Sequence, residues 1–215
     1  MRDDVLLTPE LLLRAYQIGI FPMSEARHSA TLFWVDPERR GVIPLEGLHI
    51  SRSLRRAVRK GDYDVRINAG FAEVLDGCAS RPETWINDEL RSLYLELHAR
   101  GCAHSMEIWA EGRIIGGIFG VAIGGAFFGE SMFSGRVNGS KIAMVYLVDR
   151  LRSAGFQLFD TQFITAHLAS LGAIEIARSQ YRRKLEAALV AEARFTELPL
   201  PASPQDVLQR MIQTS

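Results

Sequence analysis

The chain has 215 residues, of which 47% are apolar, so it is long enough to bury a sizeable core in one large domain or in a main domain with a small lobe. Its 25 lysines and arginines balance its 25 aspartates and glutamates, so the net charge gives no sign of a nucleic-acid partner and only local clusters of charge can do so. Cys78 and Cys102 have no metal-ligand spacing, which favours free thiols in a reducing cytoplasm. The longest weakly charged stretch, Ile114 to Gly129, is shorter than a bilayer span, so we expect no membrane segment.

Residues 1–40 are predicted to form a small lobe. They do not open with a basic segment followed by an apolar run, so we expect no signal peptide. Thr8 can cap a helix that starts with Pro9 and is ended by Gly19. An aromatic, proline-containing loop follows, from Ile20 to Pro37, and a short strand around Gly41 to Pro44 leads out of the lobe.

Three helices are expected next. Ser51 or Ser53 can cap the first, and the second spans Phe71 to Ala79. Asn87 can cap the third, Asp88 to Arg100. Its apolar positions follow helical spacing, at Leu90, Leu93, Tyr94 and Leu97.

The first of these helices carries a basic stripe. The spacing i, i+3, i+4, i+7 places four guanidinium groups on one face, with Lys60 beside them. A solvated face is the usual interpretation of a charge run, but almost no acids are interleaved here, so binding of an anion competes with it. The stripe consists of Arg52, Arg55, Arg56 and Arg59.

The centre of the chain changes to strand periodicity. Three strands joined by tight turns are predicted, and after them helices alternate with short strands. An antiparallel meander flanked by helices indicates an α+β fold, and its order is compatible with a GNAT-like (acetyltransferase-like) catalytic domain over residues 41–215. The expected strands are Ser105–Ala110, Arg113–Ile123, Ala126–Gly129, Phe156–Gln162 and Ile174–Ile176; the expected helices are 138–154, His167–Leu171, Ser179–Ala193 and Gln205–Ile212.

Two acids interrupt apolar strands. Glu130 follows two phenylalanines and a glycine, and Asp160 follows Phe159. An unpaired buried carboxylate is costly, so each is expected to line a cleft or to be hydrogen-bonded. Strand alternation places Gln162 on the same face as Asp160. The pattern favours a shared site, although Asp160 could instead anchor the fold by pairing with Arg136 or Lys141.

The glycine-rich segment Ser134–Lys141 has three interpretations. It is first a tight connection with a helix cap, second a contact to a tRNA phosphate, and third a coenzyme A pyrophosphate loop. The histidines are dispersed, and among them only His167 lies near a polar strand end where it could take part in chemistry.

Several ordered blocks together resemble the leucyl/phenylalanyl-tRNA–protein transferase family. They span roughly residues 12 to 185, and their order makes the resemblance far more specific than any single block. The blocks are Ala15–Pro22, Phe33–Pro37, Leu48–Ser53, Thr84–Asn87, His104–Ser105, Gly129–Ser134, Asn138–Lys141, Asp160–Gln162 and His167–Ala173.

The resemblance implies a small N-terminal domain on an acetyltransferase-like domain. It implies a cytoplasmic bacterial enzyme that moves Leu or Phe, less readily Met, from aminoacyl-tRNA to proteins beginning with Arg or Lys, marking them for N-degron proteolysis. It implies no metal or coenzyme, since the charged tRNA is the activated donor. The partners implied are therefore Leu-tRNA, Phe-tRNA and the acceptor proteins, and no membrane.

The resemblance also assigns roles to residues. Asp160 and Gln162 match the reaction centre, Glu130 matches the nearby acid, and Trp85 matches an aromatic that packs on the terminal adenosine. The apolar amino-acid pocket maps to Phe127, Met132, Met144 and Leu147, and the tRNA-facing basic cluster to Arg52, Arg56, Arg59 and Lys60. Two positions depart from the family: Met23 stands where several members have tryptophan, and Gly139 replaces an alanine in a change expected to be neutral.

An aminoacyl ester is already activated, so positioning can supply much of the acceleration. We expect Asp160, through Gln162, to orient the attacking amine, and Glu130 and Asp160 together to attract a basic acceptor. Two rival functions remain open. An acetyl-coenzyme A N-acetyltransferase explains the fold but not the basic stripe, and a non-catalytic RNA-binding module explains the stripe but not the two acids.

Overall fold

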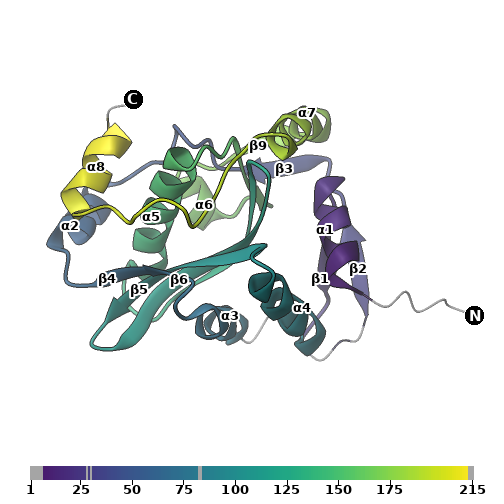
Figure 1. Cartoon of the computed structure of the whole chain (residues 1–215), viewed down its shortest axis with the longest axis horizontal. Coiled ribbons are helices and arrows are strands. Elements are labelled where there is room, and N and C mark those ends of the chain that lie inside the picture. The colour runs from purple at the N-terminus through teal and green to yellow at the C-terminus, as the bar shows by residue number, and fades with distance from the viewer. Residues whose placement is uncertain (1–6, 28, 30, 82–83, 213–215) are drawn as a thin grey trace, which may run out of the picture.

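The computed structural model describes residues 7–212 except 28, 30, 82 and 83, and it has an α+β fold built on a seven-stranded mixed sheet (Figure 1). The strand order is β4-β5-β6-β7-β8-β3-β9, and every neighbouring pair is antiparallel except β7 and β8. The predicted α+β class is confirmed. The strands are β3 (Arg39–Val42), β4 (Asp64–Ile67), β5 (Ala103–Ala110), β6 (Arg113–Ile123), β7 (Ala126–Ser134), β8 (Leu158–Gln162) and β9 (Ile174–Ala177).

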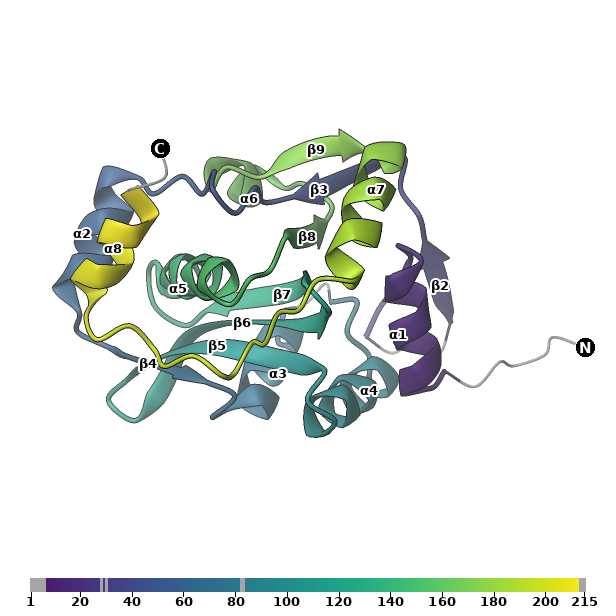
Figure 2. The ribbon, with the colours of Figure 1, turned by 45° about the horizontal axis from the view of Figure 1, so that its top comes forward.

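Helices cover both faces of this sheet (Figure 2). One hydrophobic cluster packs α1 (Pro9–Gln17), α3 (Phe71–Ala79), α4 (Asp88–Ala99) and α7 (Arg178–Leu189) against one face. A second cluster packs α2 (Arg52–Lys60), α5 (Gly139–Ser153), α6 (Ala166–Ser170) and α8 (Pro204–Ile212) against the other. No helix in the described part of the chain is both long and apolar enough to cross a membrane.

Strand β7 shows how one apolar run serves both clusters. Successive side chains of a strand point to opposite faces, so Phe127 joins the α5 cluster and Phe128 joins the α4 cluster. Phe128 packs beside Tyr16 of α1, with ring centroids 4.8 Å apart. This alternation makes the sheet the shared wall of two cores.

The segment predicted as an aromatic loop contains a separate two-stranded sheet. Strands β1 (Phe21–Ser24) and β2 (Leu32–Val35) pair antiparallel, with Pro22 opposite Trp34. Two-stranded pairing tolerates a proline because each strand keeps a free edge. The loop prediction was therefore wrong at this point.

Strand β7 is longer than expected and β4 was not expected at all. The predicted end at Gly129 overlooks the continued pairing of β7 with β6 as far as Ser134. Strand β4 alternates charged and apolar residues, and it pairs with β5 at the edge of the sheet. Both acids of interest therefore sit within paired strands.

The segment before α5 is a tight connection with a helix cap, as its first interpretation held. The Ser134 hydroxyl oxygen accepts the Ser140 backbone N–H at 2.8 Å, so Ser134 supplies the cap, whereas Asn138 makes no side-chain cap bond. Gly139 lies so close to β6 that an added β-carbon would be 2.1 Å from the Ile115 carbonyl oxygen. The expectation that alanine and glycine are equivalent here is therefore wrong in this backbone.

Candidate active site

A cavity of about 670 Å³ opens where β7 and β8 separate. These parallel strands pair only as far as Phe128 and Asp160, after which β7 continues along β6 and β8 along β3. The residues that follow on each strand line the cavity, together with β1, the end of α3 and α6. The lining includes Pro22, Met23, Arg81, Trp85, Glu130, Met132, Ser140, Thr161, Gln162, Phe163 and His167.

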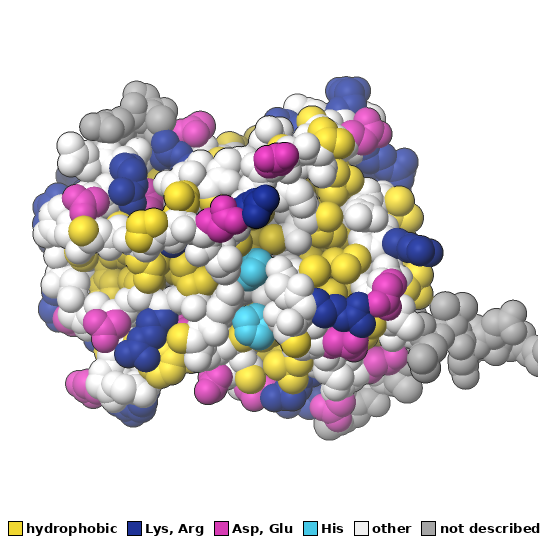
Figure 3. Space-filling view, in the orientation of Figure 1, with side chains coloured by type: hydrophobic (Ala, Val, Ile, Leu, Met, Phe, Trp, Pro, Cys, Tyr) yellow, Lys and Arg dark blue, Asp and Glu magenta, His cyan; other side chains and the backbone are white. Residues whose placement is uncertain are grey.

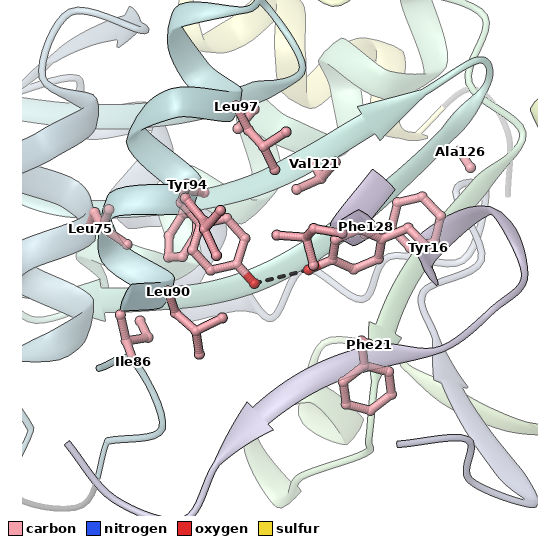
Figure 4. Close-up of a cluster of buried hydrophobic side chains, with 14 of the residues drawn as sticks. Tyr16, Phe21, Leu75, Ile86, Leu90, Tyr94, Leu97, Val121, Ala126 and Phe128 are labelled. Carbon is pink, nitrogen blue, oxygen red and sulfur yellow. Dashed lines mark hydrogen bonds between the residues drawn. The ribbon is translucent and has the colours of Figure 1, made fainter. Parts of the chain in front are cut away.

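Glu130 is the carboxylate that reaches this cavity. Its Oε2 accepts the Tyr94 hydroxyl at 2.7 Å, and its Oε1 accepts the Gln162 side-chain amide at 3.1 Å. The Tyr94 hydroxyl is 2.9 Å from the Tyr16 hydroxyl within the aromatic cluster (Figure 4). No described lysine or arginine forms an ion pair with Glu130. Burial raises the pKa of Glu130 to about 7, so this group can exchange a proton near neutral pH.

Asp160 is completely buried and does not line the cavity. Its Oδ1 accepts Arg40 Nε at 2.9 Å and the Gln162 backbone N–H at 2.8 Å. Its Oδ2 accepts Arg40 Nη2 at 2.6 Å and the Tyr181 hydroxyl at 2.7 Å. These four bonds occupy both lone-pair directions of both oxygens, so no acceptor position is left for an incoming amine.

The cation that pairs with Asp160 was not foreseen. Arg136, one of the two partners considered from sequence, pairs with Asp62 at 2.7 Å, and the true partner is Arg40, 120 residues from Asp160. Arg40 is 1% exposed, lies 4.5 Å from the ring centroids of both Phe21 and Tyr181, and donates to the Gly19 carbonyl at 3.0 Å. Two adjacent arginines at the start of a short strand give no local sign that one of them is buried.

Asp160 is connected to Gln162 through the backbone. Gln162 has φ +59°, a left-handed conformation that non-glycine residues rarely adopt, and the pairing of β3 with β8 shifts register beside it, between Gly41 and Val42. The Asp160 carboxylate accepts the Gln162 N–H in this conformation. Asp160 therefore holds the backbone that directs the Gln162 side chain toward Glu130.

Only part of the predicted amino-acid pocket borders the cavity. Of the four residues, Met132 lines it, whereas Phe127, Met144 and Leu147 are at most 1% exposed within the α5 cluster. Trp85, which the resemblance assigns to the terminal adenosine, lines the cavity too. Met132 also packs against that cluster, and Leu168 of the cluster lines the cavity, so the cavity adjoins the cluster that holds the three buried residues. Met23, at the position of a tryptophan in several family members, lines the cavity as well.

The basic stripe lies on α2, on the face away from Leu54 and Val58. Its four arginines border one hollow and form no ion pair or hydrogen bond with another described side chain. Lys60 differs, because it pairs with Asp62 at 2.8 Å. Elsewhere, basic and acidic side chains are interspersed, as the face in Figure 3 shows. The stripe is therefore a local concentration of uncompensated positive charge.

The raised pKa of Glu130 leads to a prediction about stability. The folded protein keeps a proton on Glu130 up to about pH 7, whereas the unfolded chain releases it near pH 4.5. Folded molecules then bind more protons in this range, so Glu130 lowers the free energy of unfolding as pH rises from 4.5 to 7, by at most about 1.4 kcal/mol per pH unit. Glu130→Gln should remove this decline, as measured by urea denaturation at several pH values.

The quantity to compare is the difference in the free energy of unfolding between wild type and Glu130→Gln at each pH. Burial lowers the pKa of His104 to about 4, and this acts with the opposite sign, because a neutral buried histidine favours folding as pH rises toward 6.5. Both proteins share His104, so it cancels in the difference. Identical pH profiles for the two proteins would contradict the assignment of a raised pKa to Glu130.

The residues that the structure describes contain no group of three or more histidine, cysteine, aspartate or glutamate side chains placed to hold a metal ion.

Two family models match the chain. The model described as leucyl/phenylalanyl-tRNA protein transferase matches residues 42–186, and the model of that family's N-terminal domain matches residues 6–38. Three similar proteins bear the name leucyl/phenylalanyl-tRNA–protein transferase. The one from Ruegeria pomeroyi is 61% identical over 97% of this chain and 99% of its own length. The one from Roseobacter denitrificans is 57% identical over the same shares, and the one from a Jannaschia species is 60% identical over 90% and 92%.

Proposed function

Because the chain belongs to the leucyl/phenylalanyl-tRNA–protein transferase family and is therefore an aminoacyltransferase, we propose that it moves leucine or phenylalanine, and less readily methionine, from charged tRNA to the N-terminal α-amine of proteins that begin with arginine or lysine. The product then carries a destabilising N-terminal residue that marks it for proteolysis in the cytoplasm. The division into residues 1–40 and an acetyltransferase-like domain over 41–215 is part of the same proposal, and it is supported by the two family models, which match residues 6–38 and 42–186.

The observation that carries the proposal is a carboxylate without an ion-pair partner among the described residues, beside an amide, in a cavity lined by both apolar and polar side chains. Glu130 contributes the charge, and Gln162 contributes the amide. The charge of Asp160 is compensated by Arg40, so attraction of a basic N-terminus rests on Glu130, and Asp160 plays no direct part in it. This revises the expectation that both acids attract the acceptor.

The reaction needs positioning more than a protein nucleophile. The neutral α-amine attacks the ester carbonyl carbon, the peptide C–N bond forms, and the ester C–O bond to the tRNA ribose breaks. An α-amine has a pKa near about 8, so a usable neutral fraction exists at neutral pH. Gln162 and Glu130 orient the amine, Glu130 accepts the proton that the amine loses and passes a proton to the departing ribose oxygen, and Asp160 acts as a positioning residue through the Gln162 backbone.

The donor amino acid is proposed to enter beside Met132. Its side chain displaces Met132 and reaches the cluster that contains Phe127, Met144 and Leu147, and methionines suit a pocket that accepts several shapes. Burial favours leucine, phenylalanine and methionine, and the cost of desolvation excludes polar side chains. The Trp85 ring, in edge contact with Tyr94 at 6.2 Å between centroids, is proposed to pack on the terminal adenosine.

The basic stripe on α2 is proposed to contact the tRNA backbone. Replacing Arg56 and Arg59 by alanine should weaken tRNA binding and reduce the slope of log K against log salt by about 1.4–1.8, as for two lost phosphate contacts. The matched control replaces Arg183 and Lys184, exposed on α7 and also unpaired among the described residues. Equal slopes for the α2 variant and wild type would remove the stripe from the interface.

One incubation separates this function from its rivals. The protein is mixed with labelled Leu-tRNA, acetyl-coenzyme A and a peptide that begins with arginine. We expect leucine on the peptide N-terminus and no acetyl group. Acetylation alone would identify an acetyltransferase, and binding of tRNA without any modified peptide would identify an RNA-binding module.

A further inference from the structure

We propose that the part of the cavity bordered by α5 and α6 binds the 5′-phosphate of the 3′-terminal nucleotide of the donor, through His167, Arg81 and Lys141. This rests on the proposed function, because it places a part of the aminoacyl-tRNA beside the reacting ester. The site is thus a phosphodiester subsite for an RNA 3′ end, next to the carboxylate that receives the acceptor amine.

Three basic side chains converge there. Arg81 and His167 both line the cavity, and Lys141 follows Ser140, which also lines it. The positive charges of Lys141 and Arg81 act on His167 and, with burial as the larger cause, lower its pKa. Arg81 and His167 therefore border one cavity, and Lys141 lies next to a residue that lines it.

These groups lack the partners that would normally compensate them. The Nε2 atom of His167 is buried and has no hydrogen-bond partner among the described residues. Neither Arg81 nor Lys141 forms an ion pair with a carboxylate in the part of the chain that the structure describes. The Arg81 guanidinium donates to the Met132 carbonyl, which directs it along the cavity wall. A buried nitrogen without a hydrogen-bond partner, close to two cations that have no carboxylate partner among the described residues, favours binding of an anion.

The attraction for a phosphate comes from the cationic side chains and not from the backbone N–H groups at the N-terminal end of α5. The Ser140 N–H is already bonded to Ser134, and the Gly139 N–H donates to the Arg136 carbonyl at 2.9 Å. A phosphate oxygen could accept from the Nε2–H tautomer of His167 and from the ammonium and guanidinium groups. Such charge-assisted bonds satisfy all three basic groups at once.

The surroundings favour a nucleic-acid end as the source of this phosphate. Asp62 follows α2 and pairs both with Lys60 and with Arg136, in the loop that leads to Ser140 and Lys141. This loop therefore connects the cationic part of the cavity to the basic helix. We expect an RNA strand that leaves the cavity past Lys141 to run toward the arginines of α2, which a free nucleotide would not need.

The test compares two stable donor analogues that differ by one group. The first is 3′-leucylamido-3′-deoxyadenosine, and the second carries an added 5′-phosphate. Calorimetry should show that the wild-type protein binds the phosphorylated analogue about tenfold or more tightly than the other, as expected for new hydrogen bonds to charged groups. Lys141→Met and His167→Gln should each reduce this ratio toward one and leave the affinity for the unphosphorylated analogue within about twofold.

Lys184→Met is the matched control, because Lys184 is exposed on α7, has no ion pair with any residue that the structure describes, and does not line the cavity. It should keep the wild-type ratio. A wild-type ratio near one, or a ratio that survives in both cavity variants, would overturn the subsite. The proposed function fails separately, if wild-type protein transfers no leucine from Leu-tRNA to the arginine peptide, whatever the analogues show.

Discussion

Replacing Gln162 by alanine should slow transfer of leucine to an arginine-starting peptide by roughly 10²–10⁴-fold, the usual contribution of a group that orients or accepts a proton in the transition state. The variant loses the amide that bonds Glu130 at 3.1 Å but keeps the backbone N–H that Asp160 accepts. The fold and the affinity for tRNA should therefore change little. Alanine and glutamine both lack a preference for φ +59°, so backbone strain is similar in the two proteins.

The measurement is single-turnover transfer from pre-bound Leu-tRNA, with a thermal melt of the same preparation. Thr161→Val is the matched control, because Thr161 lines the same cavity and its buried hydroxyl has no partner among the described residues. It should transfer at close to the wild-type rate. Transfer by folded Gln162→Ala at that same rate would remove Gln162 from the reaction centre.

Replacing Arg40 by methionine should lower the free energy of unfolding by about 3–5 kcal/mol, the usual result of leaving one charge of a buried ion pair uncompensated. Arg40 and Asp160 are 1% and 0% exposed, and they are joined by bonds of 2.9 and 2.6 Å. The change also removes the donor to the Gly19 carbonyl and the cation between two aromatic rings. Urea denaturation measures the loss.

The neighbouring residue provides a matched control. Arg39 pairs with Glu175 at 3.7 Å, but its side chain is 60% exposed, so Arg39→Met should cost less than about 1 kcal/mol. A double variant, Arg40→Met with Asp160→Leu, should recover part of the loss because no buried charge remains. A loss below about 1 kcal/mol for Arg40→Met alone would show that the pair does not stabilise the fold.

Local patterns in the sequence were sufficient for most helices. The spacing of Leu90, Leu93, Tyr94 and Leu97 predicted the buried face of α4, and all four side chains are buried. The Thr8 and Asn87 caps are also present, each bonded to the backbone N–H three residues later. Periodicity and capping depend on neighbours within one or two helical turns, so they can be recognised without the fold.

The candidate site depended on contacts that no local pattern contains. An acid that interrupts an apolar strand indicates a partner, and both Glu130 and Asp160 have partners, but nothing near Asp160 points to Arg40. Lys60 differs from Asp160, because its partner Asp62 is only two residues away, just beyond the end of the helix that carries the basic stripe. Strand pairing and side-chain burial decide which charges remain free, and both are properties of the folded chain.

The most direct test of the central claim is a structure of the protein bound to 3′-leucylamido-3′-deoxyadenosine, which cannot react. Our account predicts the adenine against the Trp85 ring, the leucine side chain beside Met132, and the carbonyl carbon within reach of an amine held by Glu130 and Gln162. Asp160 should keep its four bonds and touch no atom of the analogue. An analogue bound outside this cavity, or one in direct contact with Asp160, would contradict the account.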